Sequence, residues 1–99
     1  MPIKLTPSQI RFLRKQVHAK KCIVTVGNAG LTDAVIQEAD SSLSHHELMK
    51  IKINASDKPA RKAIADKICA ALDANLVQAI GHIIAIYRPA SQPLIKLPK

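Results

Sequence analysis

The fold is decided by residues 22–32, which read CIVTVGNAGLT. The first five residues are apolar or β-branched, a pattern typical of a short buried strand. Two glycines three residues apart follow, and glycine lets the backbone turn tightly because it has no Cβ. Thr32 then offers a hydroxyl that can cap a helix N-terminus. The stretch therefore predicts a strand, a glycine turn and a helix in succession.

The turn itself, Gly27-Asn28-Ala29-Gly30, is a candidate anion site. Backbone N–H groups at the start of a helix, together with the helix dipole, favour a negatively charged oxygen such as that of a phosphate. The turn lacks the Walker A pattern, and it lacks the third glycine and the acidic ribose partner of a dinucleotide site. A nucleotide hydrolase or dehydrogenase is therefore not expected. A glycine turn with a purely structural role remains the alternative.

A helix is predicted upstream, from about residue 7 to residue 19. Thr6 and Gln9 have the spacing of a capping box, and Pro7 suits the first helical position. Apolar residues recur at spacings of three and four and mark its buried face, which consists of Ile10, Leu13 and Val17.

Two further helices are predicted downstream. The second spans about residues 32–44, and the third begins after Asp57 and ends near Leu72. Apolar spacing predicts their buried faces, which are Leu31, Val35, Ile36, Ala39 and Leu43 in the second helix and Ile64, Ile68, Ala71 and Leu72 in the third.

Three more strands complete the pattern. Residues 48–53 alternate with period two, which is typical of a half-buried strand, so Lys50 and Lys52 should point together to the side opposite the core. Residues 76–80 and 83–88 are apolar runs separated by a Gly-His pair, and such spacing predicts a hairpin.

The predicted order is α-β-α-β-α-β-β, an α/β (α+β) chain. The first two strands are joined through a helix and should be parallel, whereas the hairpin strands should be antiparallel. The result is a mixed four-stranded sheet packed with helices. We expect one domain over residues 1–99, with prolines making residues 89–99 an extended tail. The tail still carries apolar residues that can pack on the body, which are Leu94, Ile95 and Leu97.

Positive charge is unevenly distributed along the chain. The net charge is +8, from 15 Lys and Arg against 7 Asp and Glu, and the pI is about 9.9. No acidic residue precedes Asp33, whereas six basic residues do, namely Lys4, Arg11, Arg14, Lys15, Lys20 and Lys21. Arg11, Arg14, Lys15 and His18 fall on one arc beside the apolar face of the first helix. Such a surface attracts polyanions, nucleic acid above all. A basic surface that serves only solubility is the alternative.

Aromatic residues are too few for base stacking. Phe12 and Tyr87 are the only two, and a sheet that stacks several bases needs several exposed rings. Any nucleic acid should therefore be held by its sugar-phosphate backbone, with shape recognised more than base sequence. For Lys50 and Lys52, an ordinary solvated strand face is an equally good reading of the alternation.

Signs of catalysis or of a metal site are weak. His45, His46 and Glu47 are adjacent and point apart, so they suit capping or packing better than a metal pair or a catalytic site. Cys22 and Cys69 form no Cys-x-x-Cys pair. We therefore expect no enzyme, no cofactor and no metal.

The cellular setting can also be predicted. No apolar run approaches the roughly 20 residues of a membrane span, and the N-terminus lacks a signal-peptide pattern. The two cysteines sit within apolar patterns and are read as reduced core residues. These features favour a cytoplasmic protein without a membrane partner.

Several motifs together resemble the CRM domain (chloroplast RNA splicing and ribosome maturation) in its single-domain bacterial YhbY-type form. They cover about residues 3–98 and are LT at 5–6, LR at 13–14, GNAGLT at 27–32, HHELMKIKI at 45–53, and Gly81 with YRP at 87–89. The resemblance implies a fold similar to the C-terminal domain of translation initiation factor three. It also implies RNA binding, with association to ribosomal RNA in precursors of the large ribosomal subunit, and in plants the same domain is built into group II intron splicing factors.

The resemblance also implies which residues bind. The family's Gly-x-x-Gly loop maps to Gly27–Gly30, and its basic surface to Arg14, Lys50, Lys52 and Arg88. Many members carry Lys or Arg after the first glycine, whereas Asn28 is neutral here. Affinity is therefore expected to depend more on nearby cations, which are Arg11, Arg14, Lys15 and Lys21.

The expected function is thus that of a monomeric, non-enzymatic protein that binds ribosomal RNA during large-subunit assembly. The alternative is a protein–protein adaptor that docks on ribosomal proteins through the first helix or the proline-rich tail, without direct RNA contact.

Overall fold

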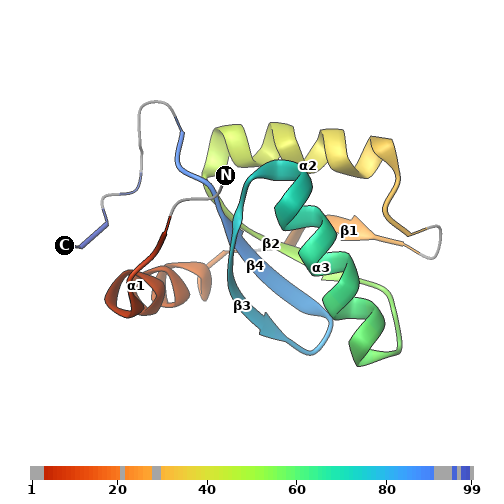
Figure 1. Ribbon diagram of the computed structural model, residues 1–99. Coiled ribbons are helices and arrows are strands. Elements are labelled where there is room, and N and C mark those ends of the chain that lie inside the picture. Colours follow the sequence, from red (N-terminus) through yellow and green to blue (C-terminus); the bar gives the residue numbers. More distant parts are fainter. Residues whose placement is uncertain (1–3, 21, 28–29, 91–94, 96, 99) are drawn as a thin grey trace.

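The computed structural model describes residues 4–20, 22–27, 30–90, 95 and 97–98. Its elements follow the predicted order (Figure 1). They are α1 (Pro7–Val17), β1 (Cys22–Val26), α2 (Asp33–His46), β2 (Leu48–Ile53), α3 (Lys58–Leu72), β3 (Asn75–Ile80) and β4 (Ile83–Tyr87). The strands form one sheet in the order β1-β2-β4-β3. β1 is parallel to β2, and β4 is antiparallel to β2 and β3, so the predicted mixed sheet is confirmed.

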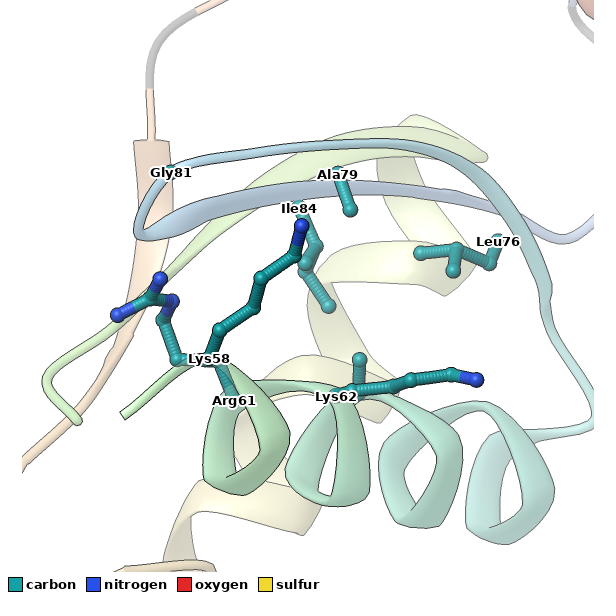
Figure 2. Close-up of a pocket in the computed structure, with 8 residues that line it drawn as sticks. Lys58, Arg61, Lys62, Leu76, Ala79, Gly81 and Ile84 are labelled. Carbon is teal, nitrogen blue, oxygen red and sulfur yellow. The ribbon is translucent and has the colours of Figure 1, made fainter. Parts of the chain in front are cut away.

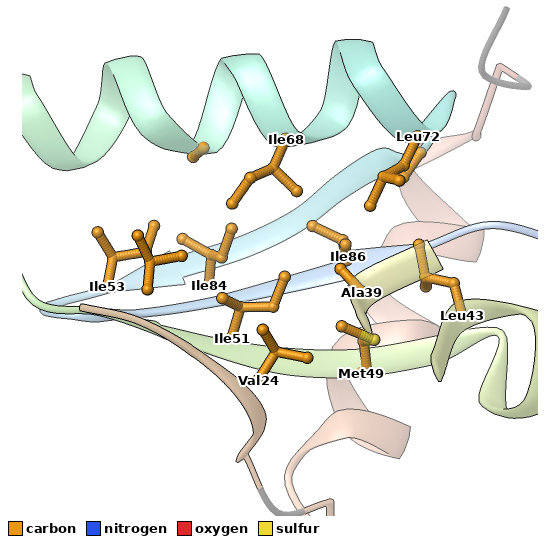
Figure 3. Close-up of a cluster of buried hydrophobic side chains, with 13 residues drawn as sticks. Val24, Ala39, Leu43, Met49, Ile51, Ile53, Ile68, Leu72, Ile84 and Ile86 are labelled. Carbon is orange, nitrogen blue, oxygen red and sulfur yellow. The ribbon is translucent and has the colours of Figure 1, made fainter. Parts of the chain in front are cut away.

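The sheet lies between two helical layers. α2 and α3 cover one face, where their apolar side chains meet those of β1, β2 and β4 in the larger core (Figure 3). α1 covers part of the other face over a smaller core, whose buried members are Leu13, Val17, Leu48, Val77, Ala85 and Tyr87. Each face of the sheet therefore has its own hydrophobic cluster.

The helix starts follow their capping signals. The Thr6 hydroxyl accepts from the N–H of Gln9 at 3.2 Å, and the Gln9 side chain accepts from the N–H of Thr6 at 3.0 Å, which confirms the capping box. Thr32 caps α2 through Val35 in the same way. Asp57 is the N-cap residue of α3, but its side chain makes no capping hydrogen bond. α1 ends at Val17, two residues before the predicted end.

Two burial predictions need correction. β2 is not half-buried throughout, because Leu48 is fully buried under α1 on the face that also carries Lys50 and Lys52. In α3 the predicted core residue Ala71 is exposed, and Ala65 is buried in its place. Helical spacing alone does not fix which edge of an apolar stripe meets the sheet, since that depends on how the helix is rotated against it.

Glu47 joins α2, β2 and the chain after β4. Its φ is +63°, and its carboxylate, fully buried, accepts from the N–H of Ala90 at 2.6 Å and from that of Ile95 at 2.7 Å. Gln9 also donates from Nε2 to the carbonyl of Pro98 at 3.0 Å. Ile95 and Leu97 pack against the smaller core, as expected of the tail, whereas Leu94 lies outside the described residues.

Candidate functional site

The glycine turn follows β1 at an open edge of the molecule. Gly27 is exposed, and a Cβ built on it would meet nothing within 4 Å. Gly30 has a φ of +81°, and its N–H donates to the carbonyl of Gly27 at 3.0 Å. Asn28 and Ala29, both predicted to bind, lie outside the described residues, as does Lys21. The turn is therefore accessible, but one of its N–H groups is already used within the turn.

The start of α2 narrows the set of amides that could meet an anion. The N–H groups of Asp33 and Ala34 belong to the first turn, which an α-helix leaves without intrahelical acceptors, whereas Val35 donates to the Thr32 hydroxyl. The carboxylate of Asp33 lies in the same turn and interacts favourably with the positive end of the helix dipole. It therefore competes with an external anion for this end of the helix. Amides alone would thus make a weak anion site, and anion binding at the turn would need a contribution from nearby cations.

Two lysines of β2, Lys50 and Lys52, lie on the sheet face that α1 leaves partly uncovered. Strand register places Lys50 of β2 beside Ala85 of β4, and Gln78 of β3 on the other side of Ala85. These three residues form a row across the sheet. Two residues further along each strand, a second row consists of the paired residues Lys52, Ile83 and Ile80. The first of these rows borders the end of α1, where His18 is the C-cap residue.

Two hollows connect α1 with this face. One, of about 190 Å³, is lined by His18 and by residues of both rows, which are Lys50, Gln78, Ile80, Ile83 and Ala85. The other, of about 520 Å³, is more open and is lined by Arg11, Arg14, Lys15 and His18, with Ser8, Phe12 and Pro98. His18 lines both hollows, so the cations of α1 and those of β2 belong to one surface.

We call this surface the basic strip, and its residues are Arg11, Arg14, Lys15, His18, Lys50 and Lys52. Lys52 is paired with Thr25 of β1, two residues before Gly27, so the strip leads toward the glycine turn. Arg14 also donates from Nε to the carbonyl of Val77 at 3.0 Å, which fixes its side chain at the edge of β3. Among the described residues that line the two hollows, none carries a carboxylate.

The family model for the CRS1 / YhbY (CRM) domain matches residues 5–88. The chain belongs to the CRM domain family.

Relatives of this CRM domain come from distant organisms. A Haemophilus influenzae protein named as an RNA-binding protein is 37% identical over 95 residues, which cover 96% of each chain. A Methanocaldococcus jannaschii protein named as a probable RNA-binding protein is 35% identical over 101 residues, covering 97% of this chain and 75% of the relative. The solution structure of a Staphylococcus aureus protein, described as a candidate RNA-binding protein, has a TM-score of 0.83 at 32% identity and covers 96% of this chain and 100% of its own.

Arg88, predicted from the resemblance to contact RNA, is engaged inside this CRM domain. Its guanidinium donates to the Asp40 carboxylate at 2.7 Å and to the Asp40 carbonyl at 3.0 Å. It also donates to the Ser44 hydroxyl at 3.1 Å and to the carbonyl of Leu72 at 3.0 Å. With these four hydrogen bonds Arg88 ties the end of β4 to α2 and α3. The basic strip therefore does not include it.

A second basic group borders the opposite face of the sheet. A groove of about 260 Å³ lies between α3 and the β3–β4 hairpin, and Figure 2 shows Lys58, Arg61 and Lys62 along its helical side. Its apolar lining consists of Ala65 of α3 and of Leu76, Ala79 and Ile84 of the two hairpin strands, with Gly81 at the hairpin turn. Arg61 Nη1 donates to the carbonyls of Ala55 and Ser56 at 2.8 and 3.0 Å, so this side chain braces the loop before α3.

Of the adjacent histidines His45 and His46, the first makes a hydrogen bond within its own helix. Nδ1 of His45 donates to the carbonyl of Ser41 at 2.9 Å, within the last turns of α2. Among the described residues, no group of three or more His, Cys, Asp or Glu side chains is placed to hold a metal ion. Over the same residues, none of the helices has the length and apolar character needed to cross a bilayer.

Sequence reasoning did not identify Gln78 as a member of the surface, whereas it placed His18 on the basic arc of the first helix. Gln78 reaches Lys50 only across β4, and His18 reaches Lys50 only through the packing of α1. No local pattern marks Gln78, because its neighbours are set by contacts between distant parts of the chain.

Proposed function

We propose that this CRM domain binds structured RNA by its sugar-phosphate backbone, through the basic strip and the turn of residues 27–30. The relatives named as RNA-binding proteins support the choice of RNA. The net charge of +8 supports a polyanion as the ligand. The scarcity of aromatic residues supports recognition through phosphates rather than through a row of stacked bases.

The observation that carries this proposal is the continuity of the strip. α1 supplies Arg11, Arg14 and Lys15, β2 supplies Lys50 and Lys52, and His18 lies between the two groups. Because no described residue that lines the two hollows carries a carboxylate, the charges of these cations are available to neutralise phosphates. Asn28, Ala29 and Lys21 stay part of the proposed contact as predictions from the sequence.

The proposed target is ribosomal RNA in precursors of the large ribosomal subunit, where the protein would assist assembly as a monomer in the cytoplasm. This finer statement rests on the resemblance to the YhbY-type proteins. Crosslinking in cells, followed by mapping of the bound RNA, tests it. Nuclease treatment separates it from the adaptor alternative, because an adaptor would stay on ribosomal particles after the contacted RNA is digested.

RNA contact by the strip is tested with two charge-matched double variants. Lys50→Glu with Lys52→Glu alters the strip, and Lys58→Glu with Lys62→Glu alters the groove on the other face by the same total charge. Binding to a structured RNA is measured over a salt series for both variants and the unchanged protein. Each lost phosphate contact should lower the slope of log affinity against log salt by about 0.7–0.9.

We therefore expect the strip variant to lose about 1.4–1.8 of the slope and the groove variant to keep it. Circular dichroism verifies that both variants fold. Equal losses in the two variants would mean that only the overall charge attracts RNA, and the proposed contact surface would then be wrong.

A further inference from the structure

We infer that the 190 Å³ hollow on the strip receives one unpaired RNA base, which would give this protein a base-specific contact in addition to its grip on phosphates. The inference rests on the proposed function, since the strip must first hold the RNA. It concerns a different property, namely discrimination between RNAs of similar shape.

The hollow is built by a small residue between two long ones. Ala85 lies at its floor, with Lys50 on one side and Gln78 on the other, because the three residues are paired across β2, β4 and β3. The end of α1, with His18, closes the side toward the smaller core. Ile83 and Ile80 close the opposite side. A methyl group between longer walls leaves room for a flat ring.

Two exposed isoleucines on this surface have no role in the core. Ile80 is 62% exposed and Ile83 is 36% exposed, and the two are paired across the hairpin next to Lys52. Contact with phosphates does not stabilise exposed apolar side chains, because phosphates are charged and are solvated by water and cations. Covering the face of a base does stabilise them, as it does the apolar side chains of other nucleic-acid-binding proteins that insert between bases.

Gln78 supplies the polar group that can read a base edge. Its carboxamide offers donors and an acceptor side by side, and within the described chain it makes no hydrogen bond to another residue. A glutamine amide pairs with adenine through two hydrogen bonds, so an unpaired adenosine is the ligand that fits. Lys50, at the other wall, is placed to meet the phosphate of the same nucleotide.

The test uses three RNA hairpins that differ at one position. The first carries a single unpaired adenosine in its stem, the second an abasic residue there, and the third is fully paired. Binding of each is measured by fluorescence anisotropy for the unchanged protein, for Gln78→Met and for Ala85→Leu. Gln78→Met keeps the side-chain length and removes the hydrogen bonds, whereas Ala85→Leu fills the hollow.

We expect the unchanged protein to bind the adenosine hairpin about tenfold more tightly than the abasic one. Gln78→Met should abolish this preference while its affinity for the paired hairpin and its salt slope stay the same. Ala85→Leu should do likewise, and because Ala85 packs under α1, Gln78→Met decides the matter if the other variant does not fold.

The inference is overturned if the unchanged protein does not distinguish the adenosine from the abasic hairpin, or if Gln78→Met keeps the preference. In either case, tight and salt-dependent binding of all three hairpins would leave the proposed function standing. Failure of all three hairpins to bind at low salt would overturn the proposed function and this inference together.

Discussion

At Gly30 the backbone has a φ of +81°, a conformation that residues with a Cβ rarely adopt, whereas Gly27 has no such value and open space around it. The fold therefore requires glycine at Gly30 but not at Gly27. Close approach of a ligand to the backbone, as proposed for the turn, would be a reason for glycine at Gly27.

Alanine substitutions at the two positions should thus have opposite effects. Gly30→Ala should lower the free energy of unfolding by about 1 kcal/mol, because alanine is strained at positive φ. Gly27→Ala should leave stability unchanged or slightly higher, yet weaken RNA binding, because its Cβ would stand between the turn and a phosphate. Urea denaturation and RNA titration measure the two properties. Full RNA affinity of Gly27→Ala would contradict contact at the turn.

Among the elements, the end of β4 is held by Arg88, which binds two residues of α2 and the last residue of α3. Its side chain is 21% exposed, so these charge-assisted bonds are only partly screened by solvent. The residue therefore stabilises the arrangement of the helices on the sheet.

Replacing this arginine should affect stability and leave RNA contact intact. Arg88→Met keeps much of the apolar stem and removes all four hydrogen bonds, so we expect a loss of about 2 kcal/mol in the free energy of unfolding. Lys67→Met, at an exposed position of α3, removes the same charge and should cost almost nothing. The two variants should show the same salt slope in RNA binding. A reduced slope for Arg88→Met alone would restore Arg88 to the contact surface.

At the scale of the whole molecule, we expect a response to alkaline pH through the half-buried Cys69 and the buried Tyr87. Burial, and then the charge of Asp66, raises the pKa of Cys69 from 9.0 to about 11. Burial, and then the charge of Glu47, raises the pKa of Tyr87 above 10.0. Both groups keep their protons longer in the folded state than in the unfolded chain. Their stabilising effect is complete below about pH 9 and is lost as the pH rises toward the folded-state values.

We therefore expect the free energy of unfolding to be flat around pH 8 and to fall above about pH 9. Urea denaturation at a series of pH values measures this. Tyr87 is the only tyrosine, so phenolate absorbance reports its ionisation directly. Cys69→Ala removes the thiol contribution and should reduce the early part of the decline. Constant stability through about pH 10.5 would show that neither group is coupled to folding.

Local patterns in the sequence determined the order of the elements and most of their bounds. The strand bounds Cys22–Val26 and Leu48–Ile53 were predicted correctly, as was the capping box of Thr6, because periodicity and capping depend only on residues a few positions apart. The parallel direction of β1 and β2 and the antiparallel hairpin of β3 and β4 followed from the connections between these strands, whereas the pairing of β2 with β4 was not predicted.

Only the tertiary structure decided which surfaces remain free. In it, Leu48 is buried beneath α1, and Arg88 forms hydrogen bonds to α2 and α3. Gln78 lies across β4 from Lys50. These outcomes depend on strand register and on helix rotation against the sheet, and both are set by contacts between residues far apart in the chain. A sequence pattern fixes which side of an element is apolar, but the neighbour that covers it is fixed by packing.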